Sequence, residues 1–353
     1  MPRPTPDSIL RVDLTDRTCV RDPVPETWRR RYIGGKGLGA RYLYAELDSG
    51  TEPLGRENRL CFMLGPLTGY LPGEQRYAVV TKSPLTGAFL DSYAGGSFPG
   101  ALAGALEDHV GVVVTGIADE PVCLVVEDAS VHLEPAADLW GADTSETCAA
   151  FPDASVACIG PAGERRVRYA TVASDGGDHQ AGRGGAGAVM GSKRLKAIVA
   201  RGDPPSGLAD LRAAYTDRFA EDAVGRWQAA SETLESVDFA DEIGGLATRG
   251  WEASRFEGLS DIGIEAARGV ATERERDDES IPGGFRVATD DGDSVPRGAT
   301  QMTLGATLGV DEFDAVVTLG DACDRLGLDV ISAGNAVAWA MLAAREGVID
   351  RDL

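Results

Sequence analysis

The sequence predicts an α+β protein: an N-terminal β-sheet domain followed by a partial helical domain. Glycine supplies 45 of 353 residues, well above the usual share of roughly 7 %, and it is clustered. Short β-branched runs of strand length lie between the glycine clusters. Helical spacing takes over after a Pro- and Gly-rich linker at 202–207. We therefore expect a β-rich domain over residues 1–203 and a helical domain over 208–353.

Each expected element rests on a local pattern. Six apolar runs predict strands of the first domain, at 78–81, 111–115, 122–126, 156–159, 169–173 and 197–200. Helical spacing predicts helices at 37–47, 100–106, 145–150, 208–228, 246–251, 311–326 and 332–346. Residues 270–298 are charged and Gly-rich without periodicity, which predicts a long mobile loop.

The charge excludes several classes of protein. The net charge is −22, and only four of the 34 basic residues are Lys. Such a surface repels the phosphates of nucleic acids and anionic membranes. No apolar stretch approaches the ~20 residues that span a bilayer, and the N-terminus lacks the apolar core of a signal peptide. We expect a cytoplasmic, halophilic protein that binds neither nucleic acid nor membrane.

Cysteine and histidine give no local metal signature. The six Cys are scattered, the smallest gap being that between Cys148 and Cys158, and no Cys-x-x-Cys occurs. Isolated Cys on apolar stretches are usually inert core residues. The three His are far apart in the sequence. We therefore expect no zinc or iron–sulfur site from local spacing.

The segment 181–198 carries the strongest motif. Gly182, Gly184 and Gly185 strip side chains from the backbone, so that successive N–H groups can converge on an anion such as a phosphate. Arg183 adds a bidentate donor and Lys193 a point charge. The alternative is a glycine turn required only for tight packing.

The same segment matches the dinucleotide pattern Gly-x-Gly-x-x-Gly, with Asp203 about 20 residues beyond. We disfavour a dinucleotide fold for two reasons. The preceding residues 174–180 are polar rather than a buried strand, and Gly191 interrupts the helix that should follow. A nucleotide-dependent dehydrogenase is therefore a weak alternative.

Three further segments carry both structural and functional interpretations. The loop 34–39 is equally a turn or a ligand contact. Arg76 stands at the entrance of a strand, where it could meet a phosphate or carboxylate, and the small-residue loop 91–100 admits a ligand closely. Asp324 and Asp329 flank a glycine bend. They could accept hydrogen bonds from a heterocycle, or the bend could simply be helix capping by Gly327 and Ser332.

Together these segments resemble the aldehyde ferredoxin oxidoreductase family, the tungsten-pterin enzymes. The resemblance spans about residues 8–347, and the matching runs keep the family's order and spacing. They are 34–40, 65–69, 76–87, 159–164, 181–193 and 323–332.

The resemblance implies a β domain that forms the base for a tungsten-bis-molybdopterin cofactor. It implies that Arg76 lies between pterin and cluster, and that the glycine loop lies at the pterin phosphates. The cofactor-binding residues implied in this way are Arg76, Tyr93, Ala94, Gly95, Gly182, Arg183, Gly184, Gly185, Asp324, Gly327, Leu328 and Asp329. Tyr93 stands where the family can have Asn.

The sequence also departs from the family pattern. The family's Cys-x-x-Cys-x-x-x-Cys is missing from 280–289, so three ligands of the expected 4Fe-4S cluster are absent. The Glu-Tyr-Glu run is replaced by Arg297–Ala299, and Glu-x-x-His by Thr318–Asp321. The family's large C-terminal region is not matched, which predicts a C-terminally truncated member.

The implied function is oxidation of aldehydes to carboxylic acids with ferredoxin as the electron acceptor. The departures leave catalysis by this chain alone doubtful, and no catalytic residue is assigned. The main alternative is a non-catalytic or split-gene pterin-binding subunit, or a remnant, that needs a separate C-terminal polypeptide or a homo-dimer. A third hypothesis is an assembly or interaction protein that uses the β domain as a docking surface.

Overall fold

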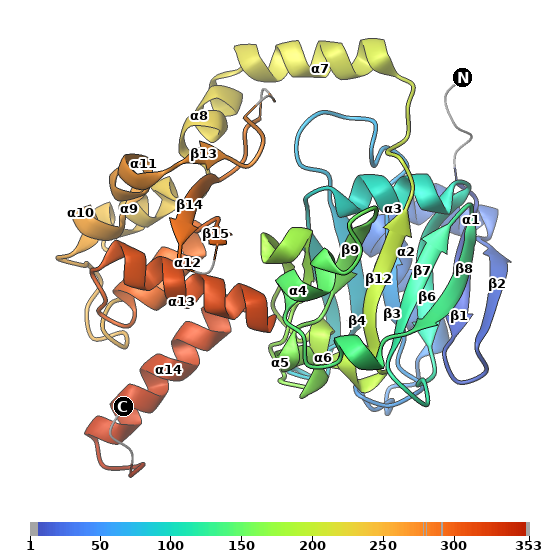
Figure 1. Ribbon diagram of the computed structural model, residues 1–353, viewed down its shortest axis with the longest axis horizontal. Coiled ribbons are helices and arrows are strands. Elements are labelled where there is room, and N and C mark those ends of the chain that lie inside the picture. The colour runs from blue at the N-terminus through green and yellow to red at the C-terminus, as the bar shows by residue number, and fades with distance from the viewer. Residues whose placement is uncertain (1–5, 278, 280, 291, 351–353) are drawn as a thin grey trace. The chain divides into compact units, whose positions relative to one another are not determined.

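The computed structural model describes residues 6–277, 279, 281–290 and 292–350. They belong to two compact units (Figure 1). The first runs to Ala213 and includes Arg325–Leu328, and the second comprises Ala214–Asp324 and the residues from Asp329 onward. The first unit is rich in strands and the second is mainly helical, as the sequence predicts.

One six-stranded sheet forms half of the first unit, in the order β2-β1-β6-β3-β4-β5. Only β1 and β6 pair in parallel, and the other neighbours are antiparallel. The bounds are β1 (Ser8–Asp13), β2 (Thr18–Pro23), β3 (Leu60–Met63), β4 (Tyr77–Lys82), β5 (Phe89–Ala94) and β6 (His109–Thr115).

A second six-stranded sheet has the order β11-β10-β9-β12-β7-β8. Here only β12 and β7 pair in parallel. The bounds are β7 (Val122–Glu127), β8 (Ser130–Pro135), β9 (Ser155–Cys158), β10 (Val172–Ser174), β11 (His179–Ala181) and β12 (Leu195–Arg201).

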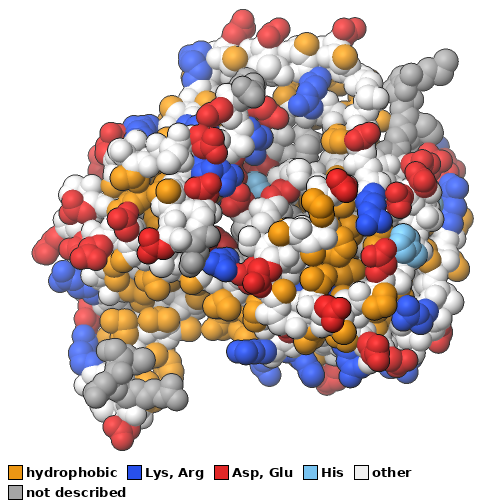
Figure 2. Space-filling view, in the orientation of Figure 1, with side chains coloured by type: hydrophobic (Ala, Val, Ile, Leu, Met, Phe, Trp, Pro, Cys, Tyr) orange, Lys and Arg blue, Asp and Glu red, His pale blue; other side chains and the backbone are white. Residues whose placement is uncertain are grey.

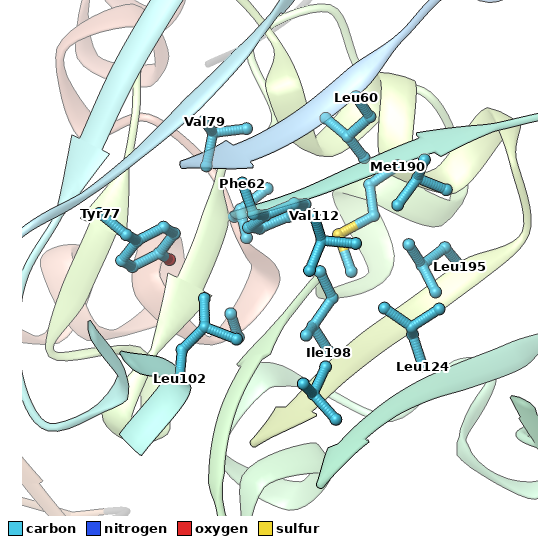
Figure 3. Close-up of a cluster of buried hydrophobic side chains, with 14 of the residues drawn as sticks. Leu60, Phe62, Tyr77, Val79, Leu102, Val112, Leu124, Met190, Leu195 and Ile198 are labelled. Atoms are coloured by element: carbon cyan, nitrogen blue, oxygen red, sulfur yellow. The ribbon is translucent and has the colours of Figure 1, made fainter. Parts of the chain in front are cut away.

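Both sheets and two helices contribute to one apolar core. Phe62 and Val112 from the first sheet, Leu124 and Ile198 from the second, and Leu102 from a helix belong to it (Figure 3). Burial of such side chains is the main favourable term in folding, worth roughly 1.5–3 kcal/mol each. The helices of this unit are α1 (Glu26–Tyr32), α2 (Gly35–Glu46), α3 (Phe98–Leu106), η1 (Ala137–Leu139), α4 (Thr144–Ala149), α5 (Pro161–Glu164), η2 (Asp175–Gly177) and α6 (Ala186–Ser192).

All six apolar runs overlap strands, namely β4, β6, β7, β9, β10 and β12. The sequence pattern missed β1, β2, β3, β5, β8 and β11. Among these, β2 and β8 have mostly exposed or half-exposed residues, which do not produce a buried apolar run. The helices expected at 37–47, 100–106 and 145–150 correspond to α2, α3 and α4.

The second unit is built from helices and one small sheet. The helix expected at 208–228 is divided at Asp222, which caps a new helix. The segment 246–251 is not helical; Thr248 within it forms a β-bridge with Ala253, two residues beyond its end. The helices here are α7 (Ala209–Glu221, which begins in the first unit), α8 (Ala223–Ser231), α9 (Glu235–Glu242), α10 (Leu259–Ile262), α11 (Ile264–Val270), α12 (Gly298–Thr300), η3 (Gln301–Ala306), α13 (Phe313–Leu326) and α14 (Val330–Arg345).

The segment 270–298 differs from the loop expected. It contains β13 (Glu273–Arg274), β14 (Phe285–Thr289) and β15 (Gly292–Ser294), which form an antiparallel sheet; residues 278, 280 and 291 lie outside the described residues. Arg274 stacks 4.1 Å from the ring centroid of Phe285. Strands this short bury few side chains, so the sequence carries no periodic signal.

Acidic side chains are scattered over the face shown in Figure 2, with Lys and Arg among them. In the part of the chain that the structure describes, no helix combines the length and apolar character that crossing a membrane requires.

Candidate functional site

The end of the β4–β5 hairpin brings several of the predicted residues together. Tyr77 and Ala94 form the last pair of the ladder, so Arg76 and Gly95 are the residues just beyond it on the two strands. Ala94 and Gly95 are buried, whereas Arg76 and Tyr93 are exposed. Partial burial and donation of its hydroxyl to Asp91 raise the pKa of Tyr93 to about 12. The hairpin end therefore presents one cation and one neutral phenol on a backbone of small residues.

The glycine loop is attached to the same hairpin by two serines. Ser92 on β5 donates its hydroxyl to the Gly182 carbonyl, and Ser83 after β4 donates to the Gly184 carbonyl at 2.7 Å. These two bonds place the loop along the hairpin: Gly182 lies at Ser92, next to Tyr93, whereas Gly184 lies at Ser83, at the turn end.

Close packing explains why this loop requires glycine. Gly184 and Gly185 have φ of +77° and +85°. A Cβ on Gly184 would lie 2.4 Å from Leu90, and one on Gly185 would lie 2.1 Å from the Arg168 carbonyl oxygen. Arg183, which precedes them, is exposed and has a φ of +67°. Successive residues of left-handed conformation at a helix start form the kind of backbone that binds anions.

Gly327 and Leu328 connect to the glycine loop through residues 168–171. Thr171 donates its N–H to the Gly327 carbonyl at 2.9 Å, and Leu328 forms a β-bridge with Ala170. Ala170 also contacts the helix that follows the glycine loop: Gly187 of α6 donates its N–H to the Ala170 carbonyl at 3.0 Å. The first unit thus holds ten of the twelve predicted residues on three connected segments.

Asp324 and Asp329 belong to the second unit. Asp329 is buried and caps α14, accepting hydrogen bonds from the Ser332 N–H at 3.2 Å and the Ser332 hydroxyl at 2.6 Å. The predicted cap at Ser332 is therefore wrong by three residues. Gly327, with φ of +71°, does stop the preceding helix, as the capping interpretation predicts.

Three titratable residues near the hairpin, Glu74, Asp175 and His179, were missed by the sequence analysis. The Glu74 carboxylate lies between Arg76 and buried His179, at 3.3 Å from Arg76 Nη2 and 3.3 Å from His179 Nδ1. Asp175 accepts the Ser97 N–H at 2.7 Å, just after Gly95. Glu74 stands two residues before Arg76 in the sequence. This spacing was the only sequence signal that the two side chains could form an ion pair.

Two expectations about the segment 181–198 are wrong. Lys193 is not a charge at the glycine loop: it is fully buried and donates to the Gly116 carbonyl at 3.2 Å, at the far end of α6. Burial lowers the pKa of Lys193 to about 8. The residues before the loop do include a strand, β11, and Gly191 lies within α6 rather than interrupting it. Nevertheless β11 pairs only with antiparallel β10, which is not a dinucleotide-binding arrangement.

Tight packing also accounts for two other glycines. A Cβ on Gly191 would lie 2.0 Å from the Gly163 carbonyl oxygen, so it allows α5 and α6 to touch. Gly34 belongs to the loop 34–39, which the sequence analysis interpreted as either a turn or a ligand contact. A Cβ on Gly34 would lie 2.4 Å from the Leu64 carbonyl oxygen, so packing requires glycine here too.

No group of three or more His, Cys, Asp or Glu within the described ranges is arranged to hold a metal ion. The residues described in 281–289 form β14 and the turn before it, without a thiol; residue 280 lies outside the described residues.

Comparison with models of protein families identifies the same family as the sequence motifs. The model of the aldehyde ferredoxin oxidoreductase N-terminal domain matches residues 9–202. The model of domains 2 and 3 of aldehyde ferredoxin oxidoreductase matches residues 210–353. The chain therefore belongs to the aldehyde ferredoxin oxidoreductase family.

Individual relatives agree. The tungsten-containing aldehyde ferredoxin oxidoreductase of Pyrococcus abyssi is 34% identical over 362 aligned positions, covering 98% of this chain and 59% of that relative. The WOR-like subunit of aliphatic sulfonate oxidoreductase from Pyrococcus furiosus is 28% identical, covering 98% of this chain and 60% of that protein. The chain thus spans about three fifths of the length of these curated relatives.

A solved structure shares the fold. The active-site complex BamBC of benzoyl coenzyme A reductase, bound to 1,5-dienoyl-CoA, contains a chain that superposes with a TM-score of 0.82 at 25% identity. The superposition covers 99% of this chain and 57% of that one.

Proposed function

We propose that this chain provides the tungstopterin-binding part of an enzyme that oxidises aldehydes to carboxylic acids, with ferredoxin as the electron acceptor. The observation that carries the proposal is that Ser83 and Ser92 bind the glycine loop 182–185 to the β4–β5 hairpin, whose strands also position Arg76 and Tyr93. The tungsten-containing relatives supply the identity of the cofactor and of the reaction.

The residues present fit a phosphorylated pterin. The N–H groups of Gly184 and Gly185 would be the donors to a phosphate, in a loop that close packing against Leu90 and the Arg168 carbonyl holds in place. Arg183 and Arg76 would add positive charge to bind phosphates. Asp324 and Asp329 belong to the second unit, and Asp329 already accepts hydrogen bonds from Ser332, so their role as acceptors for ring N–H groups rests on the family resemblance alone. When bound, the tungsten–pterin group supplies the two-electron redox chemistry of aldehyde oxidation.

The chain's own contribution is binding and orientation. Glu74 lies between Arg76 and His179, which limits where the Arg76 guanidinium can point. The buried Ala94 and Gly95 bring the backbone close to a ligand without a bulky side chain. A rigid support of this kind holds the reacting group in place and excludes water from one side of it.

The residues present do not fit the 4Fe-4S cluster of the family. A cubane cluster requires four thiolates, and the sequence has no Cys between Cys158 and Cys323. No electron-transfer step through a cluster is therefore assigned to this chain.

The missing cluster ligands favour a second candidate function. In it the chain is a non-catalytic or split-gene pterin-binding subunit that acts with a separate C-terminal polypeptide or as a homo-dimer. The relatives extend well beyond the matched three fifths. In this case the chain would bind the cofactor but would not turn over aldehyde alone.

A paired substitution tests the cofactor site. Arg183 and Arg166 are both exposed and both have positive φ, at 67° and 59°, but only Arg183 lies in the glycine loop. We expect Arg183→Gln to lower the tungsten and pterin content of anaerobically purified protein several-fold, with Arg166→Gln unchanged. Elemental analysis and the fluorescence of released pterin measure this. Equal content in both variants, or no tungsten in the unsubstituted chain, would contradict the site.

Turnover separates the two candidates. Tungsten-loaded protein is mixed with an aldehyde and a viologen dye as artificial acceptor. Dye reduction by the chain alone supports the complete oxidoreductase. Tungsten binding without dye reduction supports the subunit.

The acidic, Lys-poor composition supports a further proposal, that the protein works in a salt-rich cytoplasm. We expect the midpoint of thermal unfolding to rise between 0.1 M and 2 M KCl, because salt screens repulsion among carboxylates. A midpoint that falls with KCl would contradict the halophilic assignment.

A further inference from the structure

Two cysteines of the first unit lie side by side although the sequence gives no motif for them. Cys148 lies on α4 and Cys158 at the end of β9, and their sulfur atoms are 3.9 Å apart. A disulfide requires about 2.05 Å, so the sulfurs must approach by about 2 Å. Helix α4 has only six residues, and exposed residues follow it, which permits a small shift.

The two thiols differ in environment. Cys148 is half-buried, whereas Cys158 is completely buried. Hydrogen bonds from the Cys158 thiol and from the Gly176 N–H lower the pKa of Cys148. The interaction with Cys148 and burial raise the pKa of Cys158. Thiolate is the reactive form of cysteine, so Cys148 is the thiol suited to react first.

We propose that Cys148 and Cys158 form a reversible intramolecular disulfide in exchange with a low-molecular-weight disulfide. The Cys148 thiolate attacks one sulfur of the reagent, breaking its S–S bond and releasing one thiolate. Cys158 then gives its proton to the thiolate released in the first step and attacks the Cys148 sulfur. The Cys148–Cys158 bond forms, a second thiolate leaves, and the reagent has been reduced by two electrons.

The link has a path to the candidate cofactor site within the same unit. The Gly176 N–H that binds Cys148 is adjacent to Asp175. The Asp175 carboxylate accepts hydrogen bonds from both the N–H and the hydroxyl of Ser97, two residues beyond Gly95. A disulfide sulfur is a weaker acceptor than a thiolate, so oxidation releases the Gly176 N–H and loosens the segment that holds Ser97.

The test uses the full chain and glutathione disulfide at pH 8. After the reaction, the protein is denatured, alkylated with N-ethylmaleimide and cleaved beside Asp153, which separates the two cysteines for mass spectrometry. We expect one cross-linked peptide pair, two fewer alkylated thiols, and full reversal by dithiothreitol. In the oxidised protein we also expect amide hydrogen exchange at 175–177 to be several-fold faster than in the reduced form.

Cys19 is the internal control, because it is also half-buried but burial raises the pKa of its thiol. We expect the Cys148 thiol to be lost at least ten-fold faster than that of Cys19. Cys19→Ser should keep the cross-link, and Cys148→Ser should abolish it while leaving Cys158 alkylatable. A persistent glutathione adduct on Cys148 with Cys158 still a thiol, or faster reaction of Cys19, would overturn the proposal. Unchanged exchange at 175–177 would overturn the path to Ser97.

Discussion

The two units stabilise buried charge in different ways. In the first unit, Lys193 and Lys196 are fully buried; both ammonium groups donate to backbone carbonyls, and that of Lys196 also pairs with the Glu164 carboxylate. In the second unit, Arg297 keeps partial exposure and bridges two carboxylates, Glu232 and Glu275, at 3.1 Å and 2.8 Å. The first arrangement uses fully buried ammonium groups and mainly backbone carbonyls, whereas the second uses a partly exposed guanidinium between two carboxylates.

The apolar cores of the two units differ in size. The main cluster of the first unit includes residues from both sheets and from α3 and α6. The cluster around Leu234 and Phe285 in the second unit contains four buried residues, and α7 has no buried residue. The comparison indicates that the first unit has the larger apolar core with which to hold its part of the candidate site in one fixed geometry.

The largest expected effect comes from the buried ion pair of the first unit. Lys196 lies 2.6 Å from Glu164, whose side chain is 6% exposed. Lys196→Met leaves that carboxylate buried without its partner, and we expect a loss of about 4 kcal/mol in the free energy of unfolding. Chemical denaturation followed by circular dichroism measures it. The exposed Lys36→Met is the control, with a change of about 0.5 kcal/mol or less. Similar losses in both variants would remove the distinction.

The next effect tests the close packing of the glycine loop. Gly185→Ala combines a left-handed backbone with a contact to the Arg168 carbonyl, and we expect a loss of about 3 kcal/mol. Gly87→Ala has the same backbone region, φ of +70°, with nothing within 4 Å of the added Cβ, and we expect about 1 kcal/mol. Equal midpoints of urea denaturation for the two variants would show that the loop is not tightly packed.

A smaller effect is expected in the second unit. Arg297→Leu removes the partner of Glu275, whose side chain is 4% exposed, but the Gly284 N–H still donates to that carboxylate at 2.5 Å. We therefore expect a loss of about 2 kcal/mol. Arg345→Leu, which breaks the exposed pair with Glu252, should leave stability unchanged. If Arg297→Leu is also neutral, the ion pairs do not stabilise this unit.

The smallest effect concerns pH. Burial lowers the pKa of Lys193 from 10.5 to about 8, so the unfolded chain binds more protons than the folded chain between pH 8 and 10.5. Stability from this group therefore rises with pH across that window. We expect the unsubstituted protein to gain about 1 kcal/mol relative to Lys193→Met between pH 7 and 9. A difference that stays constant or falls would show that Lys193 titrates normally.

The sequence by itself determined the α+β class, the family and the glycine loop. Apolar runs such as 122–126 become buried strands because β-branched residues without polar neighbours have one favourable location, the sheet core. The Gly182–Gly185 motif was readable because glycine alone tolerates left-handed backbone and close contact together.

Only the tertiary structure decided the partners of isolated polar residues. Lys193 appeared to belong to the loop nearby in sequence, but α6 carries it to the Gly116 carbonyl. Glu74 and His179 meet although 105 positions separate them, and Cys148 meets Cys158 because α4 folds back on β9. Local patterns report backbone preference and burial, whereas these contacts depend on how strands distant in sequence are paired.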